Sequence, residues 1–364
     1  FFKQKTAYEI STRDWSSDVC SSDLIVNEAL GDAAPARPIA MWWALMETDN
    51  PMLDAFYRLN RADTLPAARS AAAGIHAPGL NVVWANATGD IAWWAAARLP
   101  RRPAGVNPTF ILDGRTEEAD KLGFLPFEDN PHEENPARGW IVSANAQPPG
   151  MHPVPGYYNP WDRVLRLSQR LASPGPKWTA DAAHELQLDV QTGYAQRVLS
   201  PLLPALRDAA STESERALVE QLASWTGVHE TSLVAPTVFH QFEYELARQA
   251  MADELGDAAF ANLGRTRALE QALPRLAADA DSPWWDRRDT PDQRETRAQI
   301  VKSAWQAALG HLRRLYGDDP RQWTWGRAHT LTHAHPLGLQ APLDRVLNVD
   351  RKSTRLNSSH EWIS

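Results

Sequence analysis

The strongest constraint on the fold is a change of pattern part-way along the chain. In residues 25–146 the apolar residues form short strand-like runs, and 81–86 and 91–98 are separated by Ala87-Thr88-Gly89-Asp90, where glycine suits the positive φ of a hairpin turn. From Asp162 onward the apolar residues recur at helical spacing. Strands followed by helices predict an α+β fold, in which a helical region follows a sheet.

Three regions are therefore expected within residues 25–350. They are a mainly sheet region at 25–150, a mainly helical region at 151–320 and a return to sheet at 321–350. Other expected strands are 38–47 and 139–144, and the predicted helices are 52–60, 65–74, 162–172, 179–199, 213–225, 237–255, 266–277 and 290–316. Thr179 is a suitable N-cap, Thr290-Pro291 suits a helix start, and Gly317 suits the residue that follows a helix.

Both ends of the chain differ from the middle. Segments 1–24 and 351–364 have no sustained period of 2 or 3.6, and they contain as many lysines as the whole of 25–350. Segment 1–24 also lacks the apolar stretch of a signal peptide. We interpret both segments as foreign or disordered tails that resemble translated sequencing adapters. The single cysteine, Cys20, lies in the first, so a cysteine nucleophile or cysteine–zinc site within 25–350 is excluded.

Bulk composition excludes some classes of function. Apolar residues make up 43% and charged residues 23% of the chain, as in globular proteins. The net charge of −8 gives no electrostatic basis for a nucleic-acid partner. The longest apolar run, 91–97, is far shorter than the roughly 20 residues of a membrane span, so no membrane partner is expected.

His329, His333 and His335 form the tightest cluster of titratable residues, in the sequence HTLTHAH. Two histidines four apart on a helix can hold zinc, but Thr330 stands where a zinc protease motif has its glutamate. The threonines and Pro336 also disfavour a helix. We favour a structural role, and a metalloenzyme remains an alternative.

Tryptophan is abundant, with 16 residues that include the pairs Trp42-Trp43, Trp93-Trp94 and Trp284-Trp285. In a strand, neighbours face opposite sides, so one member of each pair is expected in the core and the other at a pocket or a partner helix. Core packing is the favoured explanation. A non-enzymatic Trp-rich binding module, with sugars as an example of its ligand, is the alternative.

Several segments, taken in order, resemble the β-subunit of penicillin acylases, which are N-terminal-nucleophile hydrolases. APGLNVVWANATGDIAWWAAARLPRR at 77–102 resembles the family's P-x-x-N-x-x-Y-A-D-x-x-G-N-I-G-Y hairpin, with Trp84, Asn86 and Asp90 in place of Tyr, Asp and Asn. GFLPFEDNPHEENPARGWIVSANAQP at 123–148 resembles G-x-x-P-F-x-x-x-P…N-P-x-x-G-x-I-x-x-A-N-N-x-P. Further similar segments are Asp162-Arg163, 186–203, 284–295 and 323–338. The resemblance covers nearly all of 25–350 and implies a partial αββα sandwich with a large helical region.

The resemblance also implies roles for four residues. Asn145 matches the asparagine that holds the oxyanion in this family, and Arg163 matches an arginine that supports the active site. Trp43 and Leu80 match positions that line the acyl pocket. From the residues alone, Asn145 could equally be a turn residue, Arg163 a surface helix residue, and Trp43 and Leu80 core residues.

In this family, autocatalytic cleavage exposes a serine whose α-amino group acts as the general base. That serine begins a Ser-Asn motif upstream of the hairpin, and this chain contains no Ser-Asn dipeptide. We therefore expect an internal β-subunit fragment without a nucleophile, inactive alone, whose missing partners are the α-subunit and the rest of the β-subunit.

The parent enzyme is expected to hydrolyse the linear amide of a small N-acyl compound, such as a penicillin-type side chain or an acyl-homoserine lactone. Its expected location is periplasmic or secreted. The family binds calcium, but the ligands are not recoverable, because the only aspartate between Asn145 and Arg163 is Asp162.

Overall fold

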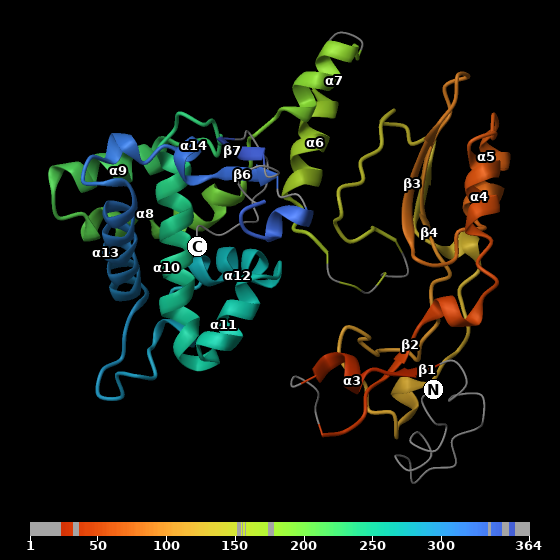
Figure 1. The fold of residues 1–364 in the computed structure, drawn as a ribbon, viewed down its shortest axis with the longest axis horizontal. Helices are drawn as coiled ribbons and strands as arrows, with labels where there is room; N and C mark the ends of the chain where they lie inside the picture. Colours follow the sequence, from red (N-terminus) through yellow and green to blue (C-terminus); the bar gives the residue numbers. More distant parts are fainter. Residues whose placement is uncertain are drawn as a thin grey trace. The chain divides into compact units, whose positions relative to one another are not determined.

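The computed structural model describes residues 23–31, 36–150, 154, 156, 158–173, 178–333, 336–343 and 349–353. The chain forms two compact units, Phe1–Asn159 and Pro160–Ser364. Figure 1 shows the first unit in red to yellow and the second in green to blue. No helix in the described ranges is both long enough and apolar enough to cross a membrane.

The first unit is built on an antiparallel sheet with the strand order β3-β4-β5, formed by β3 (Leu80–Ala85), β4 (Ile91–Ala96) and β5 (His132–Glu134). β3 and β4 form the predicted hairpin, in which Val82 is opposite Trp94. In its turn, Gly89 has a φ of 100° and the Asp90 N–H donates to Asn86 Oδ1 at 2.8 Å. The hairpin prediction is therefore confirmed.

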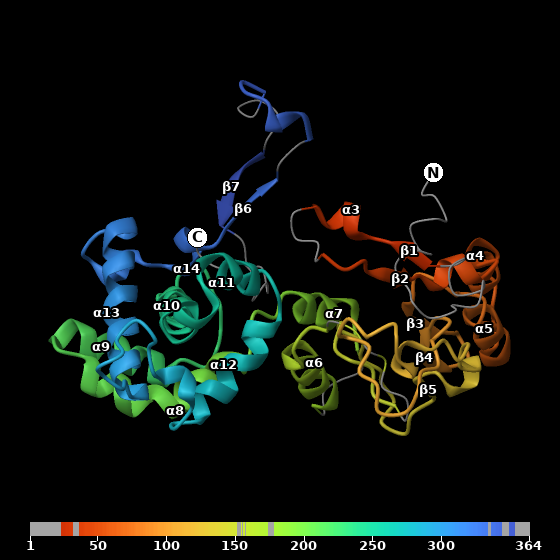
Figure 2. The same cartoon turned by 90° about the horizontal axis from the view of Figure 1, so that it is seen from below.

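One face of this sheet is covered by two short helices, α4 (Met52–Leu59) and α5 (Leu65–Ala72), which lie along β3 and β4 (Figures 1 and 2). The core between the layers contains Ala55, Ala68, Ala72, Ile75, Val82, Trp84, Ala92, Trp94 and Ala96. On the opposite face Val83 is 59% exposed, as the alternation of side chains along a strand requires. On this face β3 is therefore exposed, whereas Trp93 and Ala95 of the neighbouring β4 are buried.

The rest of the first unit contains little regular structure. β1 (Asp23–Ile25) pairs with β2 (Ala40–Trp42), and the short helices are α3 (Asn27–Leu30), η2 (Ala44–Glu47), η3 (Glu117–Ala119) and η4 (Phe127–Asp129). The strand predicted at 139–144 is wrong, because no strand is formed there. Gly139 and Asn145, at its two ends, have left-handed φ values of 74° and 58°, which interrupt an extended backbone. Strands thus occupy less of 25–150 than the sequence predicts, in the part that is described.

The second unit is helical. α10 packs against α13, and α8 packs against both α12 and α13. Because α10 buries residues on all sides, it is a core helix rather than a surface helix. The helices are α6 (Asp162–Ala172), α7 (Ala180–Gln187), α8 (Tyr194–Ala209), α9 (Glu213–Ser224), α10 (Ala235–Leu255), α11 (Asp257–Gly264), α12 (Ala268–Ala278), α13 (Arg297–Tyr316) and α14 (Trp325–Ala328), with short turns η5 (Pro283–Trp285), η6 (Pro320–Gln322) and η7 (Pro336–Leu339).

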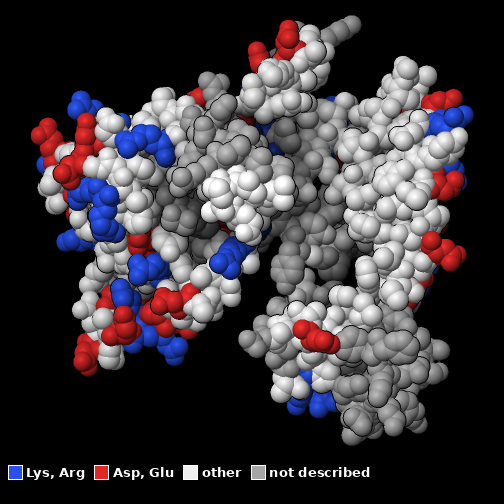
Figure 3. All heavy atoms as spheres, in the orientation of Figure 1, with Lys and Arg blue, Asp and Glu red and all other residues white. Residues whose placement is uncertain are grey.

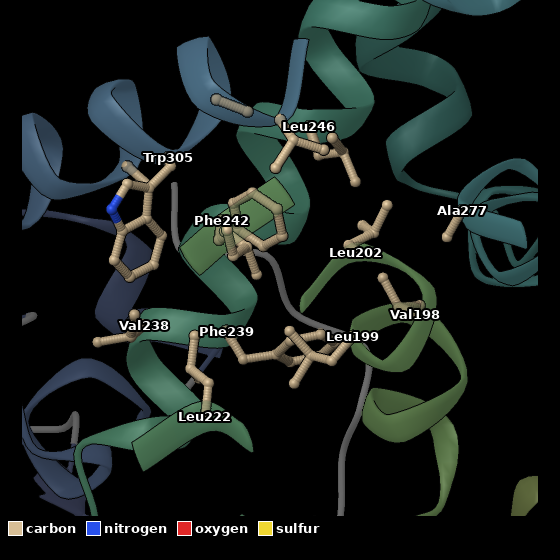
Figure 4. Packing of buried hydrophobic residues seen from close by; sticks show 14 of the residues in the cluster. Val198, Leu199, Leu202, Leu222, Val238, Phe239, Phe242, Leu246, Ala277 and Trp305 are labelled. Carbon is tan, nitrogen blue, oxygen red and sulfur yellow. The ribbon is translucent and has the colours of Figure 1, made fainter. Parts of the chain in front are cut away.

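Figure 4 shows the centre of this unit, where Phe242 of α10 meets Trp305 of α13. Their ring centroids are 6.1 Å apart and the rings lie edge to face at 70°. Both side chains are fully buried, and Leu202 of α8 and Leu246 of α10 are buried with them. Each such side chain contributes about 1.5–3 kcal/mol by burial, so this cluster is the main source of the unit's stability.

The predicted helix at 179–199 is two helices. Thr179 does cap the first, since its Oγ1 accepts from the Ala182 N–H at 3.1 Å. The chain then leaves the helix at Asp189, whose carboxylate accepts from Arg166 Nε at 3.0 Å and from the Gln191 N–H at 3.0 Å. These contacts stabilise a turn between α7 and α8 instead of a continuous helix.

The start of α13 also differs from the prediction. Thr296 is the N-cap, in a capping box with Gln299, whereas the Thr290 hydroxyl donates to Glu295 Oε1 at 2.8 Å. The predicted end is confirmed, because Gly317 follows the helix with a φ of 89° and its N–H donates to Arg313 O at 2.9 Å. The reciprocal cap at Thr296 satisfies more free N–H groups than a start at Thr290 would.

The return to sheet consists of β6 (Thr330–His333), which pairs with β7 (Val349–Ser353). Residues 23–24 and 351–353 of the predicted tails therefore lie in strands. The rest of both tails lies outside the described residues, and their foreign origin stays a prediction. In the view of Figure 3, both charge signs are interspersed over the helical unit, whereas the surface over β3 and β4 is mostly uncharged.

Candidate active site

Asn145, the predicted oxyanion residue, lies in an irregular turn of the first unit. It does not end a strand, as the sequence predicts, because 139–144 forms none. Its φ is 58°, a left-handed conformation that asparagine tolerates better than most residues, and its carbonyl accepts from the Asn159 N–H at 2.8 Å. Ala144 before it is buried, while Asn145 itself is exposed. The turn therefore presents the Asn145 amide side chain at the surface.

Arg163, the predicted supporting residue, is half-buried in the first turn of α6, in the second unit. Its neighbour Asp162 accepts from Arg197 Nη2 at 2.9 Å, and Arg166 binds Asp189 one turn later. A carboxylate in the first turn also complements the helix dipole. The helix that carries Arg163 is thus anchored to α8 and to the turn before it. The supporting role of Arg163 stays a prediction.

Trp43 and Leu80, the predicted pocket residues, are both in the first unit. Trp43 lies between β2 and η2 and is 44% exposed, and Leu80 opens β3 and is 36% exposed. The alternative that they are plain core residues is therefore wrong. Their exposure suits side chains that meet a ligand or another segment, and the pocket role stays a prediction.

Trp42, next to Trp43, has cations against its ring. The guanidinium of Arg102 lies 5.0 Å from the ring centroid and the ammonium of Lys121 lies 5.1 Å from it. Lys121 also pairs with Glu47 at 3.1 Å, and burial lowers the pKa of Arg102. These contacts support the backbone that carries Trp43.

The tryptophan pairs agree only in part with the prediction. Trp93 and Trp94 are both buried, and their Nε1–H groups donate to Asn81 Oδ1 at 2.9 Å and to Glu134 Oε1 at 2.8 Å. Neither tryptophan of that pair is therefore available at the surface to bind a ligand. Half of the other described tryptophans are core residues, namely Trp84, Trp225, Trp285, Trp305, Trp323 and Trp325, while those with substantial exposure come from separate segments, namely Trp43, Trp161, Trp178 and Trp284. The Trp-rich binding module is therefore disfavoured.

The histidine cluster does not assemble a metal site in the described residues. His329 is buried and stacks on Trp325, with centroids 4.6 Å apart and planes 14° apart. His333 ends β6, and His335 lies outside the described residues. Among the described residues no three His, Cys, Asp or Glu side chains are placed to hold a metal ion. Asp162, the only aspartate between Asn145 and Arg163, is paired with Arg197.

A buried polar chain in the helical unit was not predicted from the sequence. It consists of Tyr194, Glu243, His240 and His229. His240 and Glu243, three residues apart on the same helix, were the available signal.

Comparison with known proteins identifies the family. The family model described as penicillin amidase matches residues 19–363, nearly the whole chain and part of both predicted tails. The chain belongs to the penicillin amidase family. The predicted family is therefore confirmed.

Relatives within the penicillin amidase family carry two kinds of name. Acyl-homoserine lactone acylase QuiP of Pseudomonas fluorescens Pf-5 is 30% identical over 320 residues, which are 81% of this chain and 38% of that protein. The protein of the same name from Pseudomonas aeruginosa PAO1 is 28% identical over 353 residues, which are 87% of this chain and 40% of that protein. Penicillin G acylase of Escherichia coli is 34% identical over 158 residues, which are 41% of this chain and 18% of that protein. This chain thus spans well under half the length of these relatives.

A solved structure shows the fold. The thermostable penicillin G acylase from Alcaligenes faecalis matches with a TM-score of 0.59 and 18% identity, covering 75% of this chain and 53% of that chain. The α+β fold with a large helical region, predicted as part of an N-terminal-nucleophile hydrolase, is confirmed by this likeness.

Proposed function

We propose that this chain is part of an acylase that hydrolyses the amide bond of N-acyl homoserine lactones. The observation that carries the proposal is the family match over 19–363, together with relatives named acyl-homoserine lactone acylase that align over most of the chain. The relative named penicillin G acylase aligns over 41% of it. The longer alignments favour the lactone as the amine part of the substrate.

In the proposed mechanism a serine outside this chain attacks the carbonyl carbon of the amide, and its α-amino group takes the proton. Negative charge then develops on the former carbonyl oxygen. The Asn145 side-chain N–H donates to that oxygen, and the left-handed turn keeps the amide from reorganising as the charge forms. The amine leaves with the proton, and water hydrolyses the acyl-serine ester.

Arg163, Trp43 and Leu80 are assigned supporting roles. Arg163 supplies a positive charge on an anchored helix, which favours the charged transition state. Trp43 and Leu80 expose apolar surface to the acyl chain, for which burial is worth about 0.8 kcal/mol per CH₂ group.

The proposed partners are the α-subunit and the remaining part of the β-subunit. The open face of β3, where Val83 is 59% exposed, supports a neighbour that covers the sheet, since a large apolar surface is costly to leave in water. We place the parent enzyme in the periplasm or outside the cell, by its resemblance to the family.

The test measures release of homoserine lactone with an amine-reactive dye. The 364-residue chain alone is expected to show no turnover, and the gene product recovered with its upstream sequence is expected to be active. In the longer product, Asn145→Ala should lower kcat by about 10²–10³, the usual effect of removing an oxyanion donor. Asn262→Ala, on the exposed surface of α11, is the matched control and should leave kcat unchanged.

Two results would contradict the proposal. Turnover by the 364-residue chain that disappears in Asn145→Ala would show that the nucleophile lies within it. An unchanged kcat for Asn145→Ala in the longer product would remove Asn145 from the oxyanion hole.

A penicillin-type amide is the second candidate substrate, because penicillin G acylase of Escherichia coli is 34% identical over part of the chain. A chromogenic phenylacetyl amide separates the two. A kcat/KM for the phenylacetyl amide above that for fatty-acyl homoserine lactones would favour this second substrate.

A further inference from the structure

A continuous chain of hydrogen bonds crosses the interior of the helical unit. The Tyr194 hydroxyl of α8 donates to Glu243 Oε1 of α10. Glu243 Oε2 lies 3.1 Å from His240 Nδ1, and His240 Nε2 lies 3.0 Å from His229 Nε2. His229 Nδ1 lies 3.0 Å from the Gly227 carbonyl oxygen. One polar chain therefore joins α8, α10 and the turn before α10.

Aromatic rings enclose this chain. Trp325 lies 5.3 Å from the His229 ring and 5.2 Å from the His240 ring, between centroids, and Trp225 lies 5.2 Å from His229. Glu243 is 2% exposed and His229 is 8% exposed. A charge here would be separated from water, so the protonation state has a large effect on stability.

The far end of the chain fixes the direction of its hydrogen bonds. A carbonyl oxygen only accepts, so His229 Nδ1 must carry the hydrogen that points to Gly227. In a neutral imidazole, His229 Nε2 is then an acceptor, and His240 Nε2 must carry the hydrogen between the two rings. A neutral His240 therefore has an acceptor at Nδ1. Only a protonated Glu243 can donate to that acceptor.

An ionised Glu243 would require a second arrangement. Two neutral histidines would then place two acceptor nitrogens 3.0 Å apart, so one ring would have to become a buried imidazolium. In either arrangement the three titratable groups carry one proton more than an ionised glutamate and two neutral imidazoles would carry, and the surroundings decide where that proton lies.

The surroundings favour the neutral arrangement. Burial raises the pKa of Glu243 to about 8 despite the Tyr194 hydrogen bond, and burial lowers the pKa of His240 to about 3, with His329 adding to the effect. Burial and His240 likewise lower the pKa of His229 to about 3. The other charged or titratable groups near the chain are Asp162 of α6, which pairs with Arg197, Glu270 of α12, which pairs with Arg267, and His329 after α14.

We propose that Glu243 is a buried proton-binding site, which stays protonated at neutral pH and so completes a neutral hydrogen-bonded chain from Tyr194 to Gly227. The proton is a structural component that holds α8 and the 226–229 turn against α10. Because the folded chain keeps this proton up to a pH of about 8 and an unfolded glutamate releases it near 4.5, the stabilisation weakens as pH rises from 4.5 to 8.

Glu243→Gln tests the proposal in the full 364-residue chain. The glutamine amide can donate to His240 and its carbonyl can accept from Tyr194, so the variant imitates the protonated state. We expect its urea midpoint, followed by circular dichroism, to exceed that of the unmodified chain at pH 6 and to exceed it by a larger margin at pH 9, because only the unmodified chain loses this stabilisation as pH rises above 4.5. A midpoint lowered at both pH values would show an ion pair between Glu243 and His240 and would overturn the proposal.

Glu215→Gln is the matched control, because Glu215 is also a buried glutamate of this unit. Despite its burial, hydrogen bonds from Ser211 and Arg313 keep the pKa of Glu215 below its ordinary value. Its replacement should lower the midpoint at pH 6 and at pH 9. A rise at pH 9 in both variants would mean that the gain at Glu243 is a general effect of removing negative charge, against the proposal.

Nitrogen NMR of the unmodified chain tests the same point if the variant does not fold. With ¹⁵N-labelled histidine between pH 5 and 7.5, we expect His229 as the Nδ1–H tautomer and His240 as the Nε2–H tautomer, both neutral. An imidazolium signal from either ring in this range would overturn the proposal.

Discussion

The two units of this protein bury their apolar residues in different ways. In the sheet unit, α4 and α5 cover one face of β3 and β4, and Val83 on the other face is 59% exposed. In the helical unit, α10 lies among other helices and fully buries Phe239, Phe242 and Leu246. The helical unit thus closes its own core, whereas in the sheet unit β3 leaves one face exposed, although Trp93 and Ala95 of β4 are buried on that same face. The stability of the helical unit should depend on its own residues, and that of the sheet unit should depend in part on what covers the exposed face of β3.

The largest expected effect is in the closed core. Phe242→Ala removes a fully buried ring that packs edge to face on Trp305, and should lower the free energy of unfolding by about 3–5 kcal/mol. Urea titration followed at 222 nm reports mainly on helices and suits this measurement. A loss below 1 kcal/mol would mean that the helical core is not closed.

Acid should weaken the helical unit next. His229 and His240 have pKa values of about 3 when folded and near 6.5 when unfolded, so their contribution is complete above 6.5 and is lost as pH falls towards 3. Glu243 and Glu270 each have a pKa of about 8 in the folded chain, so their contribution to stability falls as pH rises from 4.5 to 8. The histidine and glutamate contributions change in opposite directions between pH 4.5 and pH 6.5, so these four residues together should stabilise the unit most in that range.

Below that window only the histidine effect remains. With two protons, each worth about 1.4 kcal/mol per pH unit, stability should fall by about 2–3 kcal/mol between pH 4.5 and 3.5. His229→Gln with His240→Gln should flatten this decline. A stability that is level from pH 4.5 to 3.5 in the unmodified chain would contradict the buried neutral histidines.

Helix caps offer a matched pair of smaller changes. Thr296→Ala removes the capping box of α13 and should cost about 1 kcal/mol in the helical unit. Thr64 precedes α5 in the sheet unit, but its side chain makes no cap hydrogen bond, so Thr64→Ala should change stability by less than about 0.5 kcal/mol. Equal losses in urea titrations of the two variants would show that cap geometry does not distinguish the units.

The smallest effect is expected on the open face of β3. Val83→Thr should change the unfolding free energy by no more than about 0.5 kcal/mol, because the side chain is exposed. Val82→Thr, on the packed face, should cost about 1–3 kcal/mol by burying a hydroxyl. If Val83→Thr is as destabilising as Val82→Thr, this face of the sheet is covered.

Local patterns predicted much of this fold. The hairpin, α6 and the ends of α4 and α5 follow from turn residues and apolar spacing, because the interactions that form them are close in sequence. The break between α7 and α8 does not, because it depends on Asp189 and Arg166, which are 23 residues apart. The start of α13 was misplaced because two threonines could serve as cap, and a contact with Glu295 occupies the first.

In the candidate site, too, features set by neighbouring residues could be predicted and features set by distant residues could not. Asn145 was found through a resemblance in sequence, but its left-handed φ was not predicted, because the expected strand before it is absent. The buried chain through His229 and His240 was missed, since His229 comes from a turn outside the helix. Sequence spacing could reveal only its i, i+3 part, His240 and Glu243.

The left-handed turn at Asn145 also restricts how this position can change during evolution. A φ of 58° is inexpensive for glycine, asparagine and aspartate, and costs roughly 1–2 kcal/mol for most other residues. Glycine would keep the turn and lose the amide, while aspartate would replace its N–H donor by an oxygen. Homologues that have lost acylase activity but kept the fold should therefore carry Gly or Asp here more often than Ala, Leu or Gln.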